Sequence, residues 1–145
     1  RFQDRRGPQT DLLGRALAYF GEKEAFSLIP AIYEDFDKAK IAAFARIVAE
    51  EQDRGDETAR QIFIEAAEEL ALLATSIAIR LGEATIGGKI AFSGGFITNN
   101  ERLWRDTEAR ILSTLPRHRV VVPQADATTG ACILARSIAN QSRLY

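Results

Sequence analysis

The fold is decided by one stretch of sequence, Lys89-Ile90-Ala91-Phe92-Ser93-Gly94-Gly95-Phe96-Ile97-Thr98-Asn99-Asn100. It has the pattern of a short strand, two glycines and the start of a helix. Because glycine has no Cβ, Gly94 and Gly95 allow a turn at positive φ and the close approach of a ligand. Ligands bind at the carboxyl ends of strands in parallel α/β sheets, and a helix start offers free N–H groups there. On spacing alone, a nucleotide-binding loop and a plain strand-to-helix turn are equally favoured.

Apolar residues at helical spacing predict helices on both sides of this segment. The expected ranges are 10–20, 22–33 with a break near Pro30, 38–54, 57–81, 99–115, and from 129 onward. The longest helix follows Asp56, a predicted N-cap. Its alanines indicate close packing against another element. Its core stripe is predicted to be Ala59, Ile62, Phe63, Ala66, Leu70, Leu73, Ile77 and Leu81.

A second strand is expected over 119–122, where Arg-Val-Val-Val precedes Pro123. The order strand, helix, strand, helix indicates a parallel pair joined by a right-handed crossover. We expect both strands to be buried and further strands to lie beside them, because two parallel strands do not make a stable sheet alone. The predicted fold class is therefore α/β and helix-rich, with two parallel strands and about five to six helices.

Composition limits the classes of function. The 145 residues are 46% hydrophobic and 27% charged, which is typical of a soluble globular protein. Lys and Arg (19) nearly balance Asp and Glu (20), so we expect no nucleic-acid partner. The single cysteine, Cys132, excludes an internal disulfide framework and favours the cytoplasm. No apolar run is long enough to cross a membrane, and the start at Arg1 without methionine suggests a fragment of a longer protein.

Several polar and reactive residues have ordinary structural interpretations. Asp126 is expected to cap the last helix, and the cluster Asp35, Asp37 and Lys38 to lie at a solvated helix start rather than at a metal. One histidine and one cysteine cannot form a zinc site, so His118 is expected to be exposed and Cys132 buried. Trp104 and Leu103 are expected in the core. The segment around Ser93 lacks the Gly-x-Ser-x-Gly pattern, which argues against a serine nucleophile.

Four stretches, taken in order, suggest a family. They are Ile32-Tyr33-Glu34-Asp35-Phe36-Asp37-Lys38 with Ala42 and Phe44; Gly55-Asp56 leading into Ala59-Arg60-Gln61-Ile62-Phe63 and Ala66; residues 89–99; and Ala127-Thr128-Thr129-Gly130-Ala131 with Leu134-Ala135-Arg136. Together they resemble the C-terminal lobe of N-acetylglucosamine kinases of the BadF/BadG/BcrA/BcrD ATPase family. That family belongs to the superfamily of actin, sugar kinases and heat-shock chaperones. The resemblance implies that residues 1–145 are a partial C-terminal nucleotide-binding lobe with an actin-like (ribonuclease H-like) fold.

The resemblance also implies a reaction and a site. The reaction is transfer of the ATP γ-phosphoryl group to the 6-hydroxyl of an amino sugar with Mg²⁺, which depends on positioning and charge neutralisation. In similar enzymes the catalytic aspartate and the sugar contacts come from upstream segments and an N-terminal lobe. None of those motifs occurs here, so no catalytic or metal-binding residue is assigned. The predicted nucleotide-binding residues are Ala42, Ser93, Gly94, Gly95, Phe96 and Asn99.

Alternatives stay open at this point. Asn99 is also explained as a helix cap and Ala42 as core packing. Within the family, an ATPase activator of acyl-CoA dehydratases would ligate an iron–sulfur cluster with cysteines, and Cys132 alone does not fit such a motif. A non-catalytic helical interaction module, or a homodimer through the alanine-rich helix, is the alternative from another class. The Gly-Gly loop favours the nucleotide site, since an interaction module does not need it.

Overall fold

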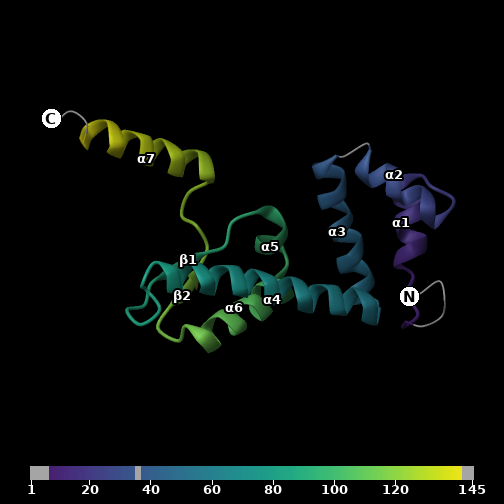
Figure 1. The fold of residues 1–145 in the computed structure, drawn as a ribbon, viewed down its shortest axis with the longest axis horizontal. Helices are drawn as coiled ribbons and strands as arrows, with labels where there is room; N and C mark the ends of the chain where they lie inside the picture. Colours follow the sequence, from purple (N-terminus) through teal and green to yellow (C-terminus); the bar gives the residue numbers. More distant parts are fainter. Residues whose placement is uncertain (1–6, 35–36, 142–145) are drawn as a thin grey trace.

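The computed structural model describes residues 7–34 and 37–141. Within these ranges the molecule is elongated, with α1 and α2 at one end and α7 at the other (Figure 1). The elements are α1 (Leu12–Phe20), a 3₁₀ turn (Ala25–Ser27), α2 (Leu28–Tyr33), α3 (Lys38–Asp53), α4 (Glu57–Arg80), β1 (Lys89–Ala91), α5 (Gly95–Asn99), α6 (Glu101–Thr114), β2 (Arg119–Val121) and α7 (Ala127–Gln141). The structure confirms a helix-rich fold with two parallel strands, and it adds the short helix α5 to the predicted set.

The two strands form a small parallel sheet whose register places Ile90 opposite Val120. Both of these residues pack against the apolar cluster between α4 and α6. The intervening positions Lys89, Ala91 and Arg119 are exposed, because successive side chains of a strand point to opposite faces. The prediction that both strands are buried is therefore wrong, since helices cover only one face of the described sheet.

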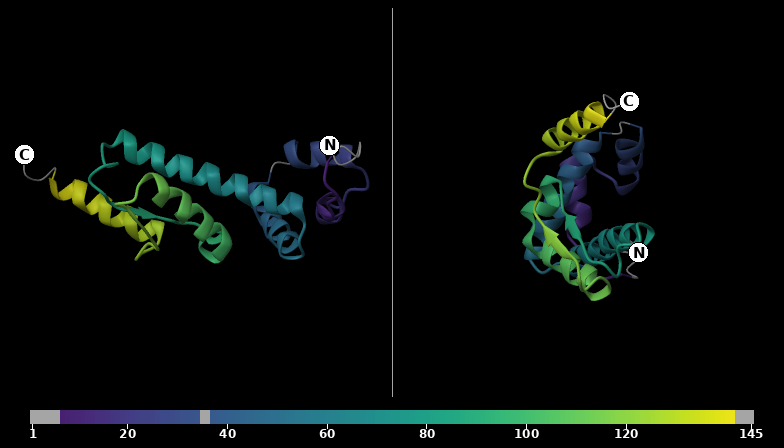
Figure 2. Two further views of the ribbon diagram at one scale, coloured as in Figure 1. Left: turned by 90° about the horizontal axis from the view of Figure 1, so that it is seen from below. Right: turned by 90° about the vertical axis from the view of Figure 1, so that its left-hand side faces the viewer.

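Helix α4 runs along the molecule and packs lengthwise against α6 (Figure 2, left). Its buried residues are Ala59, Phe63, Ala67, Ala71, Thr75 and Ala78. The predicted close packing through alanine is confirmed, because small side chains let the two backbones approach. Of the predicted stripe, Ala59 and Phe63 are buried as expected. The prediction is wrong for Leu73, Ile77 and Leu81, which are 61%, 50% and 66% exposed.

Two apolar clusters fill the space beside α4. One joins α3, α4 and α6 through Val48, Phe63 and Leu103. The other joins α4, α6 and the segment after β1, and it contains Phe92 and Ile111. A residue of α5, Ile97, packs against both clusters. The α5 segment is therefore held at the junction between the two halves of the core.

Two helix boundaries lie where the sequence predicted them. Asp37 Oδ1 accepts hydrogen bonds from the backbone N–H groups of Ala39 and Lys40, which starts α3. Gly21 ends α1 in the left-handed conformation, at φ 78°. The predicted break at Pro30 is wrong. Pro30 lies in the first turn of α2, where its missing N–H group would have no partner inside the helix.

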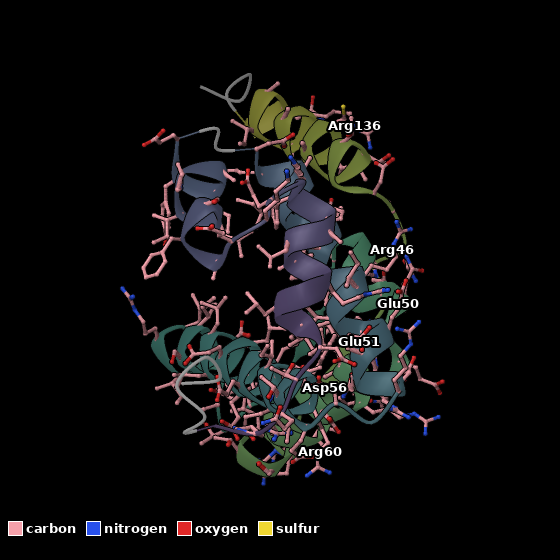
Figure 3. All side chains as sticks on the ribbon, turned by 90° about the vertical axis from the view of Figure 1, so that its right-hand side faces the viewer. Arg46, Glu50, Glu51, Asp56, Arg60 and Arg136 are labelled. Atoms are coloured by element: carbon pink, nitrogen blue, oxygen red, sulfur yellow. The ribbon has the colours of Figure 1, made fainter. Side chains whose placement is uncertain are left out.

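Charged contacts join α1, α3 and the start of α4 (Figure 3). Glu51 is buried, and its Oε1 lies 3.1 Å from Arg15 Nε and accepts a hydrogen bond from Arg54 at 2.8 Å. Asp56 Oδ1 accepts from the backbone N–H of Ala59 at 2.9 Å, and its Oδ2 accepts from that of Asp11 at 3.1 Å. The predicted N-cap role of Asp56 is confirmed, and Asp56 also holds the start of α1.

We expect Asp56→Ala to lower the free energy of unfolding by about 1 kcal/mol at pH 7, because it removes an N-cap. Burial alone raises the pKa of Asp56, but hydrogen bonds from Ala59, Thr10 and Asp11 outweigh it and lower the pKa below the ordinary 3.8. The stabilisation from this carboxylate is therefore complete above pH 3.8 and is lost as the pH falls through the lowered pKa.

Urea unfolding at pH 7 and at pH 3 measures this effect. The difference between Asp56→Ala and the unaltered chain should be smaller at pH 3 than at pH 7. Asp106→Ala, at an exposed position of α6, is the matched control and should change stability by less than about 0.5 kcal/mol. Equal effects of the two substitutions at pH 7 would contradict the capping role.

Candidate functional site

The Gly-Gly loop leaves the C-terminal end of β1 and leads into α5, beside α3 (Figure 1). Gly94 has φ 113° and ψ 133°, a conformation that L side chains rarely adopt. Its carbonyl oxygen accepts two hydrogen bonds from Thr98, one from the backbone N–H at 3.2 Å and one from the hydroxyl at 2.9 Å. These bonds tie the loop to the first turn of α5 and fix its position.

A hollow of about 520 Å³, here called the α3–α5 hollow, lies beside this loop. Helix α3 lines it with Ala42, Ala43, Arg46 and Ala49. The segment after the loop lines it with Gly95, Phe96, Asn99 and Asn100. Four of the six residues predicted to bind a nucleotide, Ala42, Gly95, Phe96 and Asn99, thus come together from two elements far apart in the sequence.

The walls of the hollow are apolar and leave space at the glycine. A Cβ built on Gly95 would meet only the side-chain amide of Asn99, at 3.9 Å. The Phe96 ring is 40% exposed and lies 5.8 Å from the Phe63 ring of the core, centroid to centroid. Phe63, which is buried in the core, therefore holds the Phe96 ring in place, and Phe96 forms an aromatic wall of the hollow.

The two other predicted residues lie elsewhere. Ser93 lines a second hollow of about 390 Å³ between β1 and α4, here called the β1 groove. Gly94 borders neither, and a Cβ on it would meet nothing within 4 Å. Gly94 thus serves the turn. The structure does not bring Ser93 into contact with the α3–α5 hollow.

Arg46 was not among the predicted site residues. It is exposed on α3 and lines the α3–α5 hollow. Its sequence signal is its spacing, because it follows Ala42 by four residues and therefore lies on the same helix face. The helix cap at this point is Asn100, whose Oδ1 accepts a hydrogen bond from the backbone N–H of Leu103 at the start of α6.

Two other sequence expectations are wrong. His118 is only 5% exposed, and it lies at the β1 groove with both ring nitrogens lacking a hydrogen-bond partner in the described residues. Packing of its turn against Gly88 buries it, since a Cβ on Gly88 would lie 3.6 Å from the imidazole. Cys132 is exposed on α7, because that helix extends away from the core (Figure 1).

Two carboxylates that the sequence analysis considered, Asp126 and Asp37, act as helix caps. Asp126 caps α7 by accepting a hydrogen bond from the backbone of Thr129 at 2.7 Å, as predicted, and that bond lowers the pKa of Asp126. Asp37 caps α3, whereas the predicted cluster partner Asp35 lies outside the described residues. In the described ranges, no group of acidic, histidine or cysteine side chains is placed to hold a metal ion.

The arrangement suits binding rather than acid–base chemistry. No Asp or Glu lines the α3–α5 hollow in the part of the chain that the structure describes. Its alanines and Phe96 offer flat apolar surface, and Asn99, Asn100 and Arg46 offer hydrogen-bond donors. Such a lining has the shape and chemistry to accommodate a planar ligand with a polar edge. Within residues 7–34 and 37–141, no helix combines the length and apolar character needed to cross a bilayer.

Comparison with known proteins adds an independent line of evidence. Residues 1–135 match the model of the BadF/BadG/BcrA/BcrD ATPase family. An N-acetylmuramic acid/N-acetylglucosamine kinase of Clostridium acetobutylicum is 30% identical over 135 residues, which are 92% of this chain and 44% of that protein. The chain thus spans less than half the length of this curated relative. No solved structure matches it significantly.

Proposed function

Since the chain belongs to the BadF/BadG/BcrA/BcrD ATPase family, we propose that it is the ATP-binding part of an ATP-dependent amino-sugar kinase. The family and the kinase from Clostridium support a sugar-kinase or ATPase role. The observation that carries the proposal is the α3–α5 hollow, where Ala42, Gly95, Phe96 and Asn99 meet.

The chemistry of this hollow suits an adenosine group. Its volume of about 520 Å³ lies within the range of small-molecule pockets, which are mostly apolar with a few placed polar groups. One face of the base would lie on the Phe96 ring, and an edge of the base would lie against the alanines of α3. Asn99 would bond a polar edge or a ribose hydroxyl. Gly95 leaves the ligand free access to the start of α5.

Finer features of the proposal come from the family resemblance. Residues 1–145 would form part of a C-terminal lobe with an actin-like fold, acting in the cytoplasm and closing with an N-terminal lobe over ATP and sugar. The acceptor would be the 6-hydroxyl of N-acetylglucosamine or a related sugar. Among the described residues, no three or more acidic, histidine or cysteine side chains form a group that could hold a metal ion. In this proposal the metal, the catalytic base and the sugar contacts come from segments outside this chain. A homodimer is compatible with this arrangement.

Photoaffinity labelling tests the site directly. We expect 8-azido-ATP to label peptides that contain residues 42–49 or 93–100, and excess ATP to suppress the labelling. The 145-residue chain, incubated with labelled ATP and N-acetylglucosamine or N-acetylmuramic acid, should bind ATP without forming a sugar phosphate. Labelling confined to other peptides would contradict the site. Sugar phosphate formed by the chain alone would contradict the assignment of the catalytic groups to other segments.

A further inference from the structure

We propose that Arg46 binds the base of the nucleotide, with its guanidinium plane stacked on the ring. This inference rests on the proposed function and names a contact within the same site. Arg46 lies four residues after Ala42, on the face of α3 that lines the α3–α5 hollow. Because its side chain is long and exposed, it can extend over a ligand that rests against the alanines.

The Arg46 side chain has no ion-pair or hydrogen-bond partner among residues 7–34 and 37–141, although acidic side chains lie close by. Glu50 follows it by one turn on α3 (Figure 3) and pairs with Arg15. The other nearby carboxylates are also engaged, Asp53 with Arg102 and Glu101 with Arg105. The Arg46 guanidinium therefore remains available for a ligand.

Arg46 lies at the border between two hollows. A smaller hollow of about 360 Å³ lies between α3 and the start of α6, next to the α3–α5 hollow. Arg46, Ala49, Asn99 and Asn100 line both hollows, so they form the ridge between them. Gly95 and Phe96 line only the α3–α5 hollow. Arg46 thus lies at the border of the α3–α5 hollow that adjoins the smaller hollow, whereas Phe96 lies away from that border.

The surfaces around Arg46 favour a base over a phosphate. Most of them are alanines and Phe96, and besides Arg46 only Asn99 and Asn100 contribute polar side chains among the described lining residues. A phosphate there would lose its hydration with few donors in exchange. A planar guanidinium, by contrast, stacks well on an aromatic ring, and a lysine ammonium does not reproduce this geometry. A base held between Phe96 and Arg46 would satisfy both sides of the hollow.

Titration calorimetry with adenosine, AMP and ATP tests the inference. We expect Arg46→Ala to weaken the binding of all three ligands by a similar factor, about tenfold. Arg46→Lys should lose most of the same affinity, because it keeps the charge but not the plane. Arg60→Ala is the matched control, since Arg60 is an exposed arginine of α4 paired with Glu57. It should leave all three affinities unchanged.

The outcomes separate this inference from the proposed function. Arg46 contacts phosphate if Arg46→Ala weakens the binding of ATP but not of adenosine, and if Arg46→Lys binds ATP as the unaltered chain does. That result would show that the inference is wrong. If Arg46→Ala changes nothing while a substitution at Gly95 removes ATP binding, the site stands and the role of Arg46 fails. Failure of the unaltered chain to bind any of the three ligands overturns both proposals.

Discussion

Replacing Gly95 with valine is expected to weaken ATP binding by about a hundredfold or more while leaving the fold intact. Gly95 is the first residue of α5 and lines the α3–α5 hollow. A Cβ there would meet only the Asn99 side chain, at 3.9 Å, which is an ordinary contact. A β-branched side chain can therefore start at Gly95 without a clash at its Cβ, and its two methyl groups would occupy space that we assign to the adenosine.

Calorimetric titration with ATP measures the loss, and urea unfolding shows that the variant remains folded. Gly14→Val is the matched control, because Gly14 lies within α1 and a Cβ there meets nothing within 4 Å. It should bind ATP like the unaltered chain. Gly94→Val is not equivalent, since φ 113° strains any side chain at that position. An unchanged ATP affinity in a folded Gly95→Val variant would rule out the α3–α5 hollow as the nucleotide site.

The elements with local signals could be predicted from the sequence. Asp56 and Gly82 bracket the longest helix, and the structure places α4 between them. A carboxylate N-cap and a left-handed glycine act within one turn of the chain, so their effect is visible in the sequence itself. The same reason explains the caps at Asp37 and Asp126.

Which side of an element faces the core could not be predicted so well. Helix α4 is apolar on several sides, and its periodicity favoured Leu73 and Ile77 over Ala67 and Ala71. In the structure Ala67 and Ala71 are the buried residues instead, because α6 approaches α4 closely only where the side chains are small. The choice depends on a partner more than 30 positions away in the sequence, which a helical pattern does not record.

The candidate site shows the same limit. The glycine loop has a local signature, but the hollow exists only because α3 lies opposite α5. Family resemblance identified Ala42, whereas Arg46, one turn later, carried no separate motif. Likewise, His118 reads as an exposed turn residue between two arginines, yet the contact of its turn with Gly88 buries it.

The lining of the β1 groove is consistent with one prediction from the sequence, that further strands lie beside β1 and β2. Leu73, Ile77 and Leu81 line it together with β1, and β1 pairs only with β2 in the described ranges. Apolar side chains beside a strand edge fit the expectation that further strands lie next to this pair. The unpartnered nitrogens of His118 at the same groove would then gain polar neighbours from such a segment.

Replacing Ile111 with alanine is expected to lower the free energy of unfolding by about 3 kcal/mol, because it leaves a cavity in a packed core. Ile111 is fully buried in the cluster that contains Phe92 and Leu115. Ile79→Ala removes the same atoms from α4 at a position that is 57% exposed, and it should change stability by less than about 0.5 kcal/mol. Urea unfolding of both variants measures the difference.

This pair of substitutions also tests which face of α4 is covered. Ile111 lies on α6, against the alanine face, whereas Ile79 lies on α4 outside that contact. A loss from Ile79→Ala as large as that from Ile111→Ala would mean that a second layer covers the exposed face of α4 in solution. A negligible loss from Ile111→Ala would instead contradict the close packing of α4 on α6, and with it the support that positions α5 and the candidate site.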